Sequence, residues 1–405
     1  MKDPWKKVFV LFIILAGICG CGDNTKVEDR QMVHNQENRQ EEKILSKEIA
    51  NLYRDIYEQA VRDSTLGNLK VTKEIVQRLG EHGYTATDGE NENQVNMSNA
   101  HEIEQFCQKV RAGENGDVTF FCIGRDGGFI QFRLTTNKGH INVTRTVVSW
   151  VDKEPYVTYE DSYEAYKWTD LGDGYLFFEQ YFPQGYDGAP GFTAVRIQPL
   201  DEMCREGNRT YILPIGYENN DFFLNNWKEG DWEELNFNDL FHALYPYVYQ
   251  RRIPYEKSVD GETYQVPAEE FETVIQSFFS IDKETLQKIG AYREESQCYL
   301  YRTRGFYDNV DSPTLPYPEV TEWKDRGDGT LSLTVHTVWP ARQLSKAMSH
   351  EVVVRKMEDG SFQYVSNRVI PSKENVEPSW YTEQLSFHFY DLFERKKDNY
   401  SCNFS

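Results

Sequence analysis

The segment VTFFCIGRDGGFIQFRLT, residues 118–135, decides the fold class of this chain. Two runs rich in β-branched and aromatic residues, 118–123 and 129–135, flank a tight turn at Asp126 and Gly127. An Asp-Gly pair supplies the positive φ that a turn between twisted strands requires. The segment therefore predicts an antiparallel hairpin, the first of several along the chain.

Strand-like runs continue after this hairpin and return in the second half of the chain. They cover residues 141–151, 156–168, 175–182, 298–301, 319–324, 331–338, 351–357 and 362–369. Consecutive strands joined by hairpins form antiparallel meanders rather than sheets built from βαβ units. We therefore expect no dinucleotide or phosphate loop in this chain.

Helical periodicity precedes each set of strands. From Lys43 onward, apolar residues recur at steps of three and four, and the same period returns over residues 71–79. Asn99 with Glu102 has the spacing of a capping pair and predicts the start of a third helix. In the second half, residues 238–249 and 267–279 predict helices, with Pro267 at a first helical position. The fold class expected is α+β, with two related domains, each carrying N-terminal helices packed on an antiparallel β-meander.

A repeated motif is the reason to expect that the two domains are related. The pattern WxDxGDG occurs at residues 168–174 and again at 323–329, 155 positions later, and RxxGF precedes both copies at 125–129 and 302–306. Landmarks that recur in one order at nearly constant spacing indicate a duplicated domain. The alternative is that two unrelated hairpins converged on the same turn. The interval between RxxGF and WxDxGDG is longer in the first copy, from residue 129 to 168, than in the second, from residue 306 to 323. This difference predicts an extra hairpin in the first copy.

The N-terminus indicates export and lipidation. A basic head precedes an apolar run from Val8 to Leu15 that is too short to span a bilayer. Ile18 and Gly20 then stand where a bacterial lipobox has an apolar and a small residue, so Cys21 is the predicted diacylglyceryl cysteine. An ordinary cleaved signal peptide or an uncleaved anchor are the alternatives. The predicted location is the extracytoplasmic face of the cell membrane, with the membrane as a partner through the N-terminal lipid.

These boundaries divide the chain of 405 residues into four parts. Residues 1–20 are the predicted lipoprotein signal peptide and 21–42 a flexible polar tether, followed by a first α+β domain at 43–215 and a second at 216–405. The chain has 44 basic and 65 acidic residues and a formal charge of −21. Such a surface repels phosphate backbones, which argues against a nucleic-acid partner.

The cysteines outside the signal region do not form a recognisable framework. They are odd in number and widely spaced, at Cys107, Cys122, Cys204, Cys298 and Cys402. A disulfide scaffold would show a dense, even set, and a metal site would show close pairs. Single buried thiols are the expected state, while one bridge such as Cys107 to Cys122 is left open. We expect no metal and no cofactor.

Two groups of residues resemble parts of hydrolytic sites. Ser280 and Lys283 form an SxxK pattern, but the chain has no KTG partner for it, and the start of a capped helix explains the spacing as well. His336 and His350 lie on neighbouring predicted strands, with Ser345, Ser349 and Glu351 close in sequence. No nucleophile elbow or HGGG-like loop accompanies them, so structural histidines are the simpler interpretation.

Aromatic residues and arginines gather in the second half and give the binding candidates. Such rings can stack on sugars or peptide side chains, and arginines can meet a carboxylate. The simpler alternative is that the rings fill strands and cores. The candidate binding residues are Tyr299, Tyr301, Arg302, Arg304, Phe306 and Tyr307.

Several longer phrases resemble an uncharacterised family of lipid-anchored surface lipoproteins from Gram-positive anaerobes. The phrases are YQVPAEEFETVI (264–275), YRTRGFYD (301–308), LPYPEV (315–320), DGTLSLTVHTVWP (328–340) and SHEVVVRKMEDGSFQYVSN (349–367). That resemblance implies surface anchoring and a two-part body, and it implies no activity or catalytic residue. Two functions are therefore expected as alternatives. One is a non-catalytic binding or scaffold lipoprotein of the cell envelope with a glycan or peptide ligand. The other is an envelope hydrolase of wall peptide, glycan or ester with an unfamiliar active site.

Overall fold

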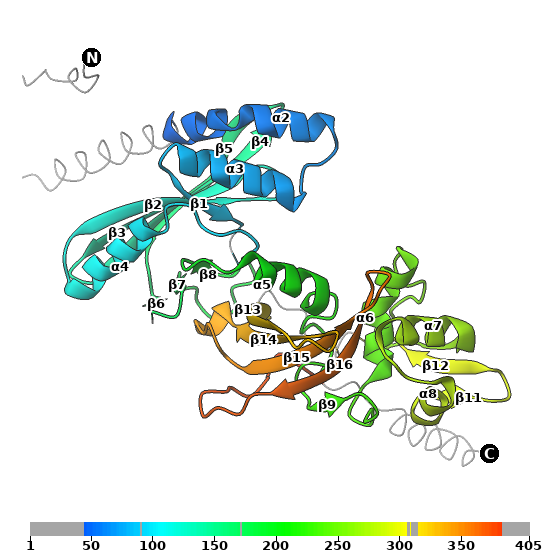
Figure 1. Ribbon diagram of the computed structural model, residues 1–405. Coiled ribbons are helices and arrows are strands. Elements are labelled where there is room, and N and C mark those ends of the chain that lie inside the picture. The colour runs from blue at the N-terminus through cyan, green and yellow to red at the C-terminus, as the bar shows by residue number, and fades with distance from the viewer. Residues whose placement is uncertain (1–43, 90, 171, 306–307, 309–314, 383–405) are drawn as a thin grey trace, which may run out of the picture.

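The computed structural model describes residues 44–89, 91–170, 172–305, 308 and 315–382. The fold is α+β, and its described strands form two five-stranded and two three-stranded sheets. Figure 1 shows one group of helices and strands from the first half of the chain above a second group from the rest of the chain. The predicted signal peptide, the predicted tether and Cys21 lie outside the described residues.

The first five-stranded sheet has the order β1-β2-β3-β4-β5. Strands β2 to β5 form the predicted antiparallel meander, with bounds β2 Gly116–Ile123, β3 Phe129–Asn137, β4 His140–Val151 and β5 Glu154–Glu164. Strand β1 (Thr85–Asp88) was not expected, and it pairs with β2 in parallel. Because helix α4 (His101–Ala112) makes the crossover between them, the sheet contains one βαβ unit, and the expectation of purely hairpin-linked strands was wrong here.

The helices that pack on this sheet through the predicted apolar stripe are the one at residues 44–52, α2 (Arg54–Arg62) and α3 (Leu69–Glu81). The ring of Tyr57 stacks on Trp150 of β4 with centroids 4.1 Å apart. The capping role predicted for Asn99 was wrong. Its side-chain amide donates hydrogen bonds to the carbonyl oxygens of Gly80 and Tyr84, so it ties the end of α3 to the loop before α4.

A three-stranded sheet lies between the two groups of elements (Figure 1). We call it the junction sheet. It consists of β6 (Lys167–Thr169), β7 (Tyr175–Glu179) and β8 (Phe192–Arg196). Leu176 and Phe178 of β7 belong to the apolar core of the first group, whereas Tyr175 and Phe177 pack with Val338 of β14. Since successive side chains of a strand point to opposite faces, both faces of this sheet are buried.

The second five-stranded sheet has the order β13-β14-β15-β16-β9. Four of its strands confirm the predicted runs, with bounds β13 Tyr317–Asp325, β14 Thr330–Val338, β15 Ser349–Lys356 and β16 Phe362–Val369. The short strand β9 (Trp227–Lys228) was not predicted. A small sheet, β10-β12-β11, lies beside it, with β10 Thr263–Pro267, β11 Tyr292–Arg293 and β12 Cys298–Arg302.

The helices of the second group share one large core with these sheets. Their bounds are α5 Glu202–Gly207, α6 Phe237–Tyr249, α7 Ala268–Phe278 and α8 Lys283–Ile289, with a π-helical turn at Asn208–Ile212 after α5. Pro267 ends β10 and stands at the N-cap of α7, one position before the predicted place. The division into domains 43–215 and 216–405 stays a prediction. The core residues themselves change from one group to the other between Ile197 and Cys204.

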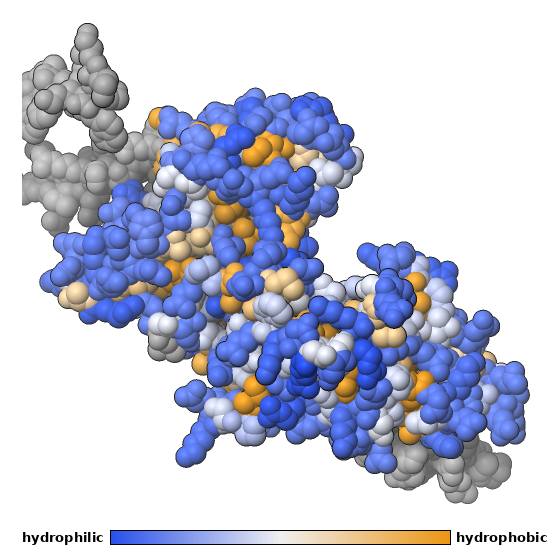
Figure 2. All heavy atoms as spheres, in the orientation of Figure 1, coloured by the Kyte–Doolittle hydropathy of each residue, from blue (hydrophilic) through white to orange (hydrophobic). Residues whose placement is uncertain are grey.

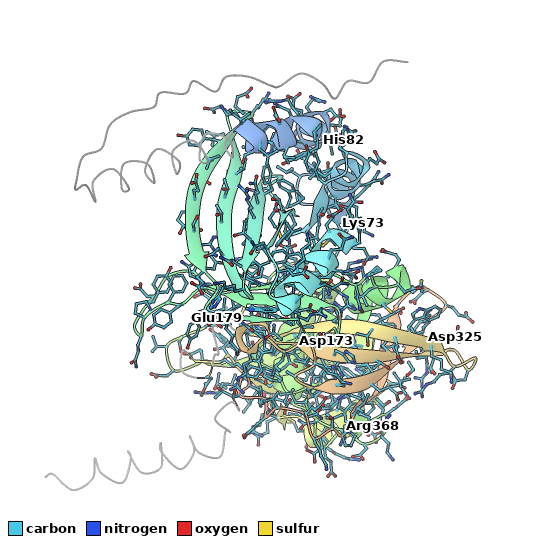
Figure 3. All side chains as sticks on the ribbon, turned by 90° about the vertical axis from the view of Figure 1, so that its left-hand side faces the viewer. Lys73, His82, Asp173, Glu179, Asp325 and Arg368 are labelled. Atoms are coloured by element: carbon cyan, nitrogen blue, oxygen red, sulfur yellow. The ribbon has the colours of Figure 1, made fainter. Side chains whose placement is uncertain are left out.

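Both copies of the WxDxGDG motif form hairpin turns of the same kind. The carboxylate of Asp170 accepts a hydrogen bond from the amide of Gly172, and that of Asp325 accepts one from Gly327. Figure 3 shows their different surroundings: Asp173 lies where the two groups meet, and Asp325 lies at the far tip of the β13–β14 hairpin. The longer interval of the first copy holds the β4–β5 hairpin. A duplication itself stays a prediction.

The surface in view is mostly hydrophilic, with apolar residues in small separate groups (Figure 2). Among the described residues, no helix has the length and apolar character needed to cross a membrane. Cys107, Cys122, Cys204 and Cys298 are free thiols, so the bridge between Cys107 and Cys122 that the sequence left open does not form.

Candidate functional site

A cavity of about 390 Å³ lies beside α6 in the second group of elements. This volume falls in the range of small-molecule sites. Three of the predicted binding residues line it, namely Tyr301, Arg302 and Arg304. The other described lining residues are Leu213, Pro214, Ile215, Glu218, Asn219, Asn238, Asp239, His242, Ala243, Pro246, Tyr247 and Lys257.

Helix α6 supplies the polar floor of the cavity. Asn236 caps the helix, because its side-chain oxygen accepts hydrogen bonds from the amides of Asn238 and Asp239 at 3.1 and 3.3 Å. The side chain of Asn238 then donates to the carbonyl of Arg302 at 2.7 Å and accepts from its amide at 2.9 Å. This pair of bonds fixes the end of β12 against the first turn of α6.

Arg304 holds the floor together. Its guanidinium donates to both carboxylate oxygens of Asp239, at 3.0 and 2.6 Å, and to the carbonyls of Asp308 and Thr382 at 2.8 and 2.7 Å. Burial raises the pKa of Asp239 to about 6, and the Arg304 guanidinium opposes that rise. Because four hydrogen bonds occupy this guanidinium, we interpret Arg304 as a positioning residue rather than as a ligand-binding group.

His242 and Tyr301 form the second polar feature of the floor. The phenol oxygen of Tyr301 lies 2.6 Å from Nδ1 of His242. Burial lowers the pKa of His242 to about 4, and the charges of Lys257 and Arg304 lower it further. Burial also raises the pKa of Tyr301 above its ordinary value. Both groups are therefore neutral near pH 7, and one donates a hydrogen bond to the other, with the direction set by the imidazole tautomer.

Exposed side chains of two kinds, apolar and charged, also line the cavity and are taken as its rim. Leu213 is 40% exposed and Tyr247 is 49% exposed, which is high for large apolar side chains. Glu218 and Lys257, both exposed, supply one charge of each sign. Apolar side chains combined with a small number of placed polar groups are the usual lining of a ligand pocket.

The remaining predicted binding residues do not line this cavity. Tyr299 is fully buried in the core, where its ring stacks on Phe271 with centroids 4.3 Å apart and its hydroxyl donates to Glu272. The expectation that Tyr299 belongs to a binding surface was therefore wrong, because it packs under α7. Phe306 and Tyr307 lie outside the described residues.

The sequence interpretation missed the contribution of α6. Asn238, Asp239 and His242 are spaced so that they share one face of an otherwise apolar helix. Polar side chains on such a face are the signal that could have found them. Their partners lie about 60 residues further along the chain, at the end of β12, and no local pattern joins the two segments.

The SxxK residues form the capped helix start that the sequence offered as an alternative. Asp282 is the N-cap of α8 and accepts a hydrogen bond from the amide of Thr285 at 2.8 Å. The ammonium of Lys283 pairs with Glu272 at 3.0 Å. Lys283 is therefore engaged by a carboxylate rather than by Ser280.

Ser345 and His350 do not come together as a hydrolytic pair. Nε2 of His350 lies 2.9 Å from the hydroxyl of Tyr217, and Nδ1 lies 2.7 Å from the side-chain oxygen of Asn367, so neighbours occupy both ring nitrogens. The hydroxyl of Ser345 donates to the carboxylate of Asp173 instead. His350 is a buried core histidine, as the simpler interpretation expected.

The other members of that group lie on the neighbouring strands β14 and β15. His336 and Ser349 occupy paired positions on β14 and β15, and the Ser349 side chain is buried. Glu351 accepts from Arg326 at 3.1 Å and lies near Arg368. Within the described part of the chain, no group of three or more His, Cys, Asp or Glu side chains could hold a metal ion.

A second polar cluster lies at the junction sheet. The carboxylate of Glu319, which is 2% exposed, accepts from Arg196 and from the hydroxyl of Tyr175, each at 2.6 Å, and also from Asn93. Burial raises its pKa, and Arg196 opposes the rise. The adjacent cavity, lined by Asn93 and Arg196, measures only about 10 Å³, enough for at most one water. This cluster fastens β13 to the junction sheet and leaves no room for a ligand.

The chain belongs to a family of unknown function, DUF6070, whose sequence profile matches residues 37–384. The match spans both groups of elements and includes the whole lining of the cavity. No curated protein and no solved structure matches the chain.

Proposed function

We propose that this protein is an extracytoplasmic, lipid-anchored binding protein of the cell envelope, and that the cavity beside α6 is its ligand site. The predicted lipidation of Cys21 supports the anchor. The lipoprotein character of the family and its occurrence in Gram-positive anaerobes are part of the same proposal. The expected ligand is an envelope peptide or glycan fragment.

The composition of the cavity lining is the observation that carries the binding role. Among the described residues that line it, there is no Ser, Thr or Cys to act as a nucleophile. The buried carboxylate, Asp239, is held by Arg304 on both oxygens. His242 is neutral and fixed by Tyr301. Groups fixed in this way can orient a ligand.

The anchor is tested by labelling cells that express the full chain with palmitate. The expected result is label on the wild-type protein at the membrane and none on a Cys21→Ser variant, which should be released or retained as precursor. Equal fractionation of both proteins without label would contradict the anchor.

The binding role is tested with soluble wall fragments from a muralytic digest, passed over the immobilised full-length protein and identified by mass spectrometry. We expect retention of intact fragments, and loss of retention when Ala243→Trp fills the cavity from α6. Circular dichroism checks that the variant is folded. Shortened fragments in the eluate would support the alternative, an envelope hydrolase acting on wall peptide, glycan or ester.

A further inference from the structure

We infer that the cavity beside α6 recognises a carboxylate carried on a compact apolar body, as at the C-terminus of a short peptide. In this arrangement Nε2–H of His242 and the ammonium of Lys257 bind the carboxylate, and Leu213 and Tyr247 contact the apolar body. The inference rests on the proposed function, since it names the ligand class of the same cavity.

The first argument is the orientation of hydrogen-bond donors. In this arrangement the phenol of Tyr301 donates to Nδ1 of His242, which lies 2.6 Å away, and the imidazole hydrogen is on Nε2. Nε2 has no hydrogen-bond partner among the described residues and is not a buried atom. In that tautomer the floor presents a neutral N–H donor beside a buried phenol, and such a donor suits an acceptor-only group such as a carboxylate.

The second argument is the sign of the local charge. Lys257 forms no ion pair with any described residue, and it lies close enough to His242 to disfavour its protonation, as Arg304 does. The surroundings of the imidazole are thus positive, in a chain whose formal charge is −21. A positive site within a strongly acidic protein attracts an anion selectively.

The third argument limits the size and charge of the anion. The carboxylate of Glu218, at the same rim, would repel a second negative charge, which favours a monoanionic carboxylate over a phosphate dianion. The exposed side chains of Leu213 and Tyr247 would gain from burial by an apolar body rather than by hydroxyl groups. A peptide terminus combines both properties.

The experiment is calorimetric titration of the full-length protein in detergent with acetyl-alanyl-alanine and with its C-terminal amide. The acid should bind at least about tenfold more tightly than the amide, because a hydrogen bond to a charged group is worth more than one to a neutral group. Lys257→Gln should remove most of this preference. Lys288→Gln, an exposed lysine on α8 that does not line the cavity, should leave it unchanged.

The histidine is tested with two variants. His242→Gln keeps an N–H donor and should retain part of the acid preference, whereas His242→Phe should lose it. Chloride, phosphate and N-acetylmuramic acid are titrated separately into the same protein. Each should bind more weakly than the peptide acid.

Three outcomes would overturn the inference. They are equal binding of acid and amide, an acid preference that survives both Lys257→Gln and His242→Phe, and tighter binding of phosphate or the sugar acid than of the peptide acid. Retention of wall fragments without any acid preference would overturn the inference alone. Absence of retained fragments together with absence of peptide binding would contradict the proposed function as well.

Discussion

The guanidinium of Arg304 reaches three separate segments: α6 through Asp239, the turn at Asp308 and the chain at Thr382. Each partner lies far from the next in sequence, so this one side chain sets the shape of the cavity floor. Its hydrogen bonds are made in a buried place, where the loss of a partner is costly.

Replacing Asp239 by Asn should lower the free energy of unfolding by about 3–5 kcal/mol, because it leaves the buried Arg304 guanidinium without its counter-charge. Urea unfolding of both proteins measures the difference. Asp187→Asn, at an exposed position outside the cavity, is the matched control and should change stability by less than about 0.5 kcal/mol. Equal losses in the two variants would contradict the role of the pair.

The buried His350 should make stability depend on pH. Burial lowers its pKa from the ordinary histidine value of 6.5 to about 4 in the folded protein. The unfolded chain therefore takes up a proton first as the pH falls, so this contribution is complete above pH 6.5 and is lost progressively toward pH 4. The loss from this residue amounts to about 3 kcal/mol.

Unfolding in urea at pH 7 and pH 4.5 measures this dependence. His350→Asn should show a smaller change between the two pH values than the wild type, although it is less stable at pH 7 because Tyr217 and Asn367 lose their partner. An identical change in both proteins would show that His350 does not contribute.

At the level of residues, the sequence indicated part of the lining of the cavity. Tyr301, Arg302 and Arg304 stood out because rings and arginines cluster around them, and they line the cavity. His242 did not stand out, because its partner Tyr301 is brought to it only by the packing of β12 on α6. Tyr299 was misassigned because it and Tyr301 are the same residue type on one strand, β12, and the sequence does not show that their surroundings differ.

Among the elements, the turn of the β2–β3 hairpin is packed closely against side chains from other segments. Gly127 has a φ of +76°, and its carbonyl accepts hydrogen bonds from Tyr53 and Trp150. A Cβ atom there would lie 2.7 Å from the ring of Tyr57. Gly327, in the second WxDxGDG turn, has a φ of +75° but has open space around it.

Replacing each of the two glycines by alanine separates the stability cost of the backbone conformation from the cost of the packing around the turn. Gly327→Ala should cost about 1–2 kcal/mol, the penalty of the left-handed conformation alone. Gly127→Ala should cost that amount and a further 1–3 kcal/mol, because the methyl group displaces Tyr57 from its stack on Trp150. Thermal unfolding of both variants measures the difference, and equal shifts in Tm would contradict the packing argument.

The elements themselves were largely predictable, because the patterns that indicate hairpins and amphipathic helices lie in residues close together in sequence. Strands β2 to β5 and β12 to β16 and helices α3, α6 and α7 lie where their periodicity placed them. Strand β1 was missed because its four residues, Thr85–Asp88, are all buried and show no alternation. Asn99 was misassigned because its side chain finds partners at the end of α3 rather than at its own helix.

In the whole molecule, the buried cluster around Glu319 connects the two groups of elements. Its carboxylate on β13 accepts from Arg196 and Tyr175 of the junction sheet, and from Asn93 of the first group. Lys73 of α3 and Glu202 of α5 add an exposed ion pair at 2.8 Å. The sequence could not predict this cluster, because Glu319 is more than 100 residues from each of its three partners.

Glu319→Ala should lower the free energy of unfolding by about 3–5 kcal/mol, because Arg196, Tyr175 and Asn93 lose a shared acceptor in a buried place. Glu322→Ala, at an exposed position on the same strand, is the control and should be nearly neutral. Calorimetry checks both, and we expect the Glu319 variant alone to broaden or split the transition. A single unchanged transition would contradict the coupling of the two groups.

The junction sheet also governs how this protein can be divided. Leu176 and Phe178 belong to the core of the first group, whereas Tyr175 and Phe177 pack in a small separate cluster with Val338 of the second group, so each group covers only one face of the same three strands. Expressing either half by itself would expose a contiguous apolar surface to water and would promote aggregation. Anyone trimming the chain for crystallisation should therefore shorten the ends and keep the middle whole, which agrees with a family profile that runs through it without a break.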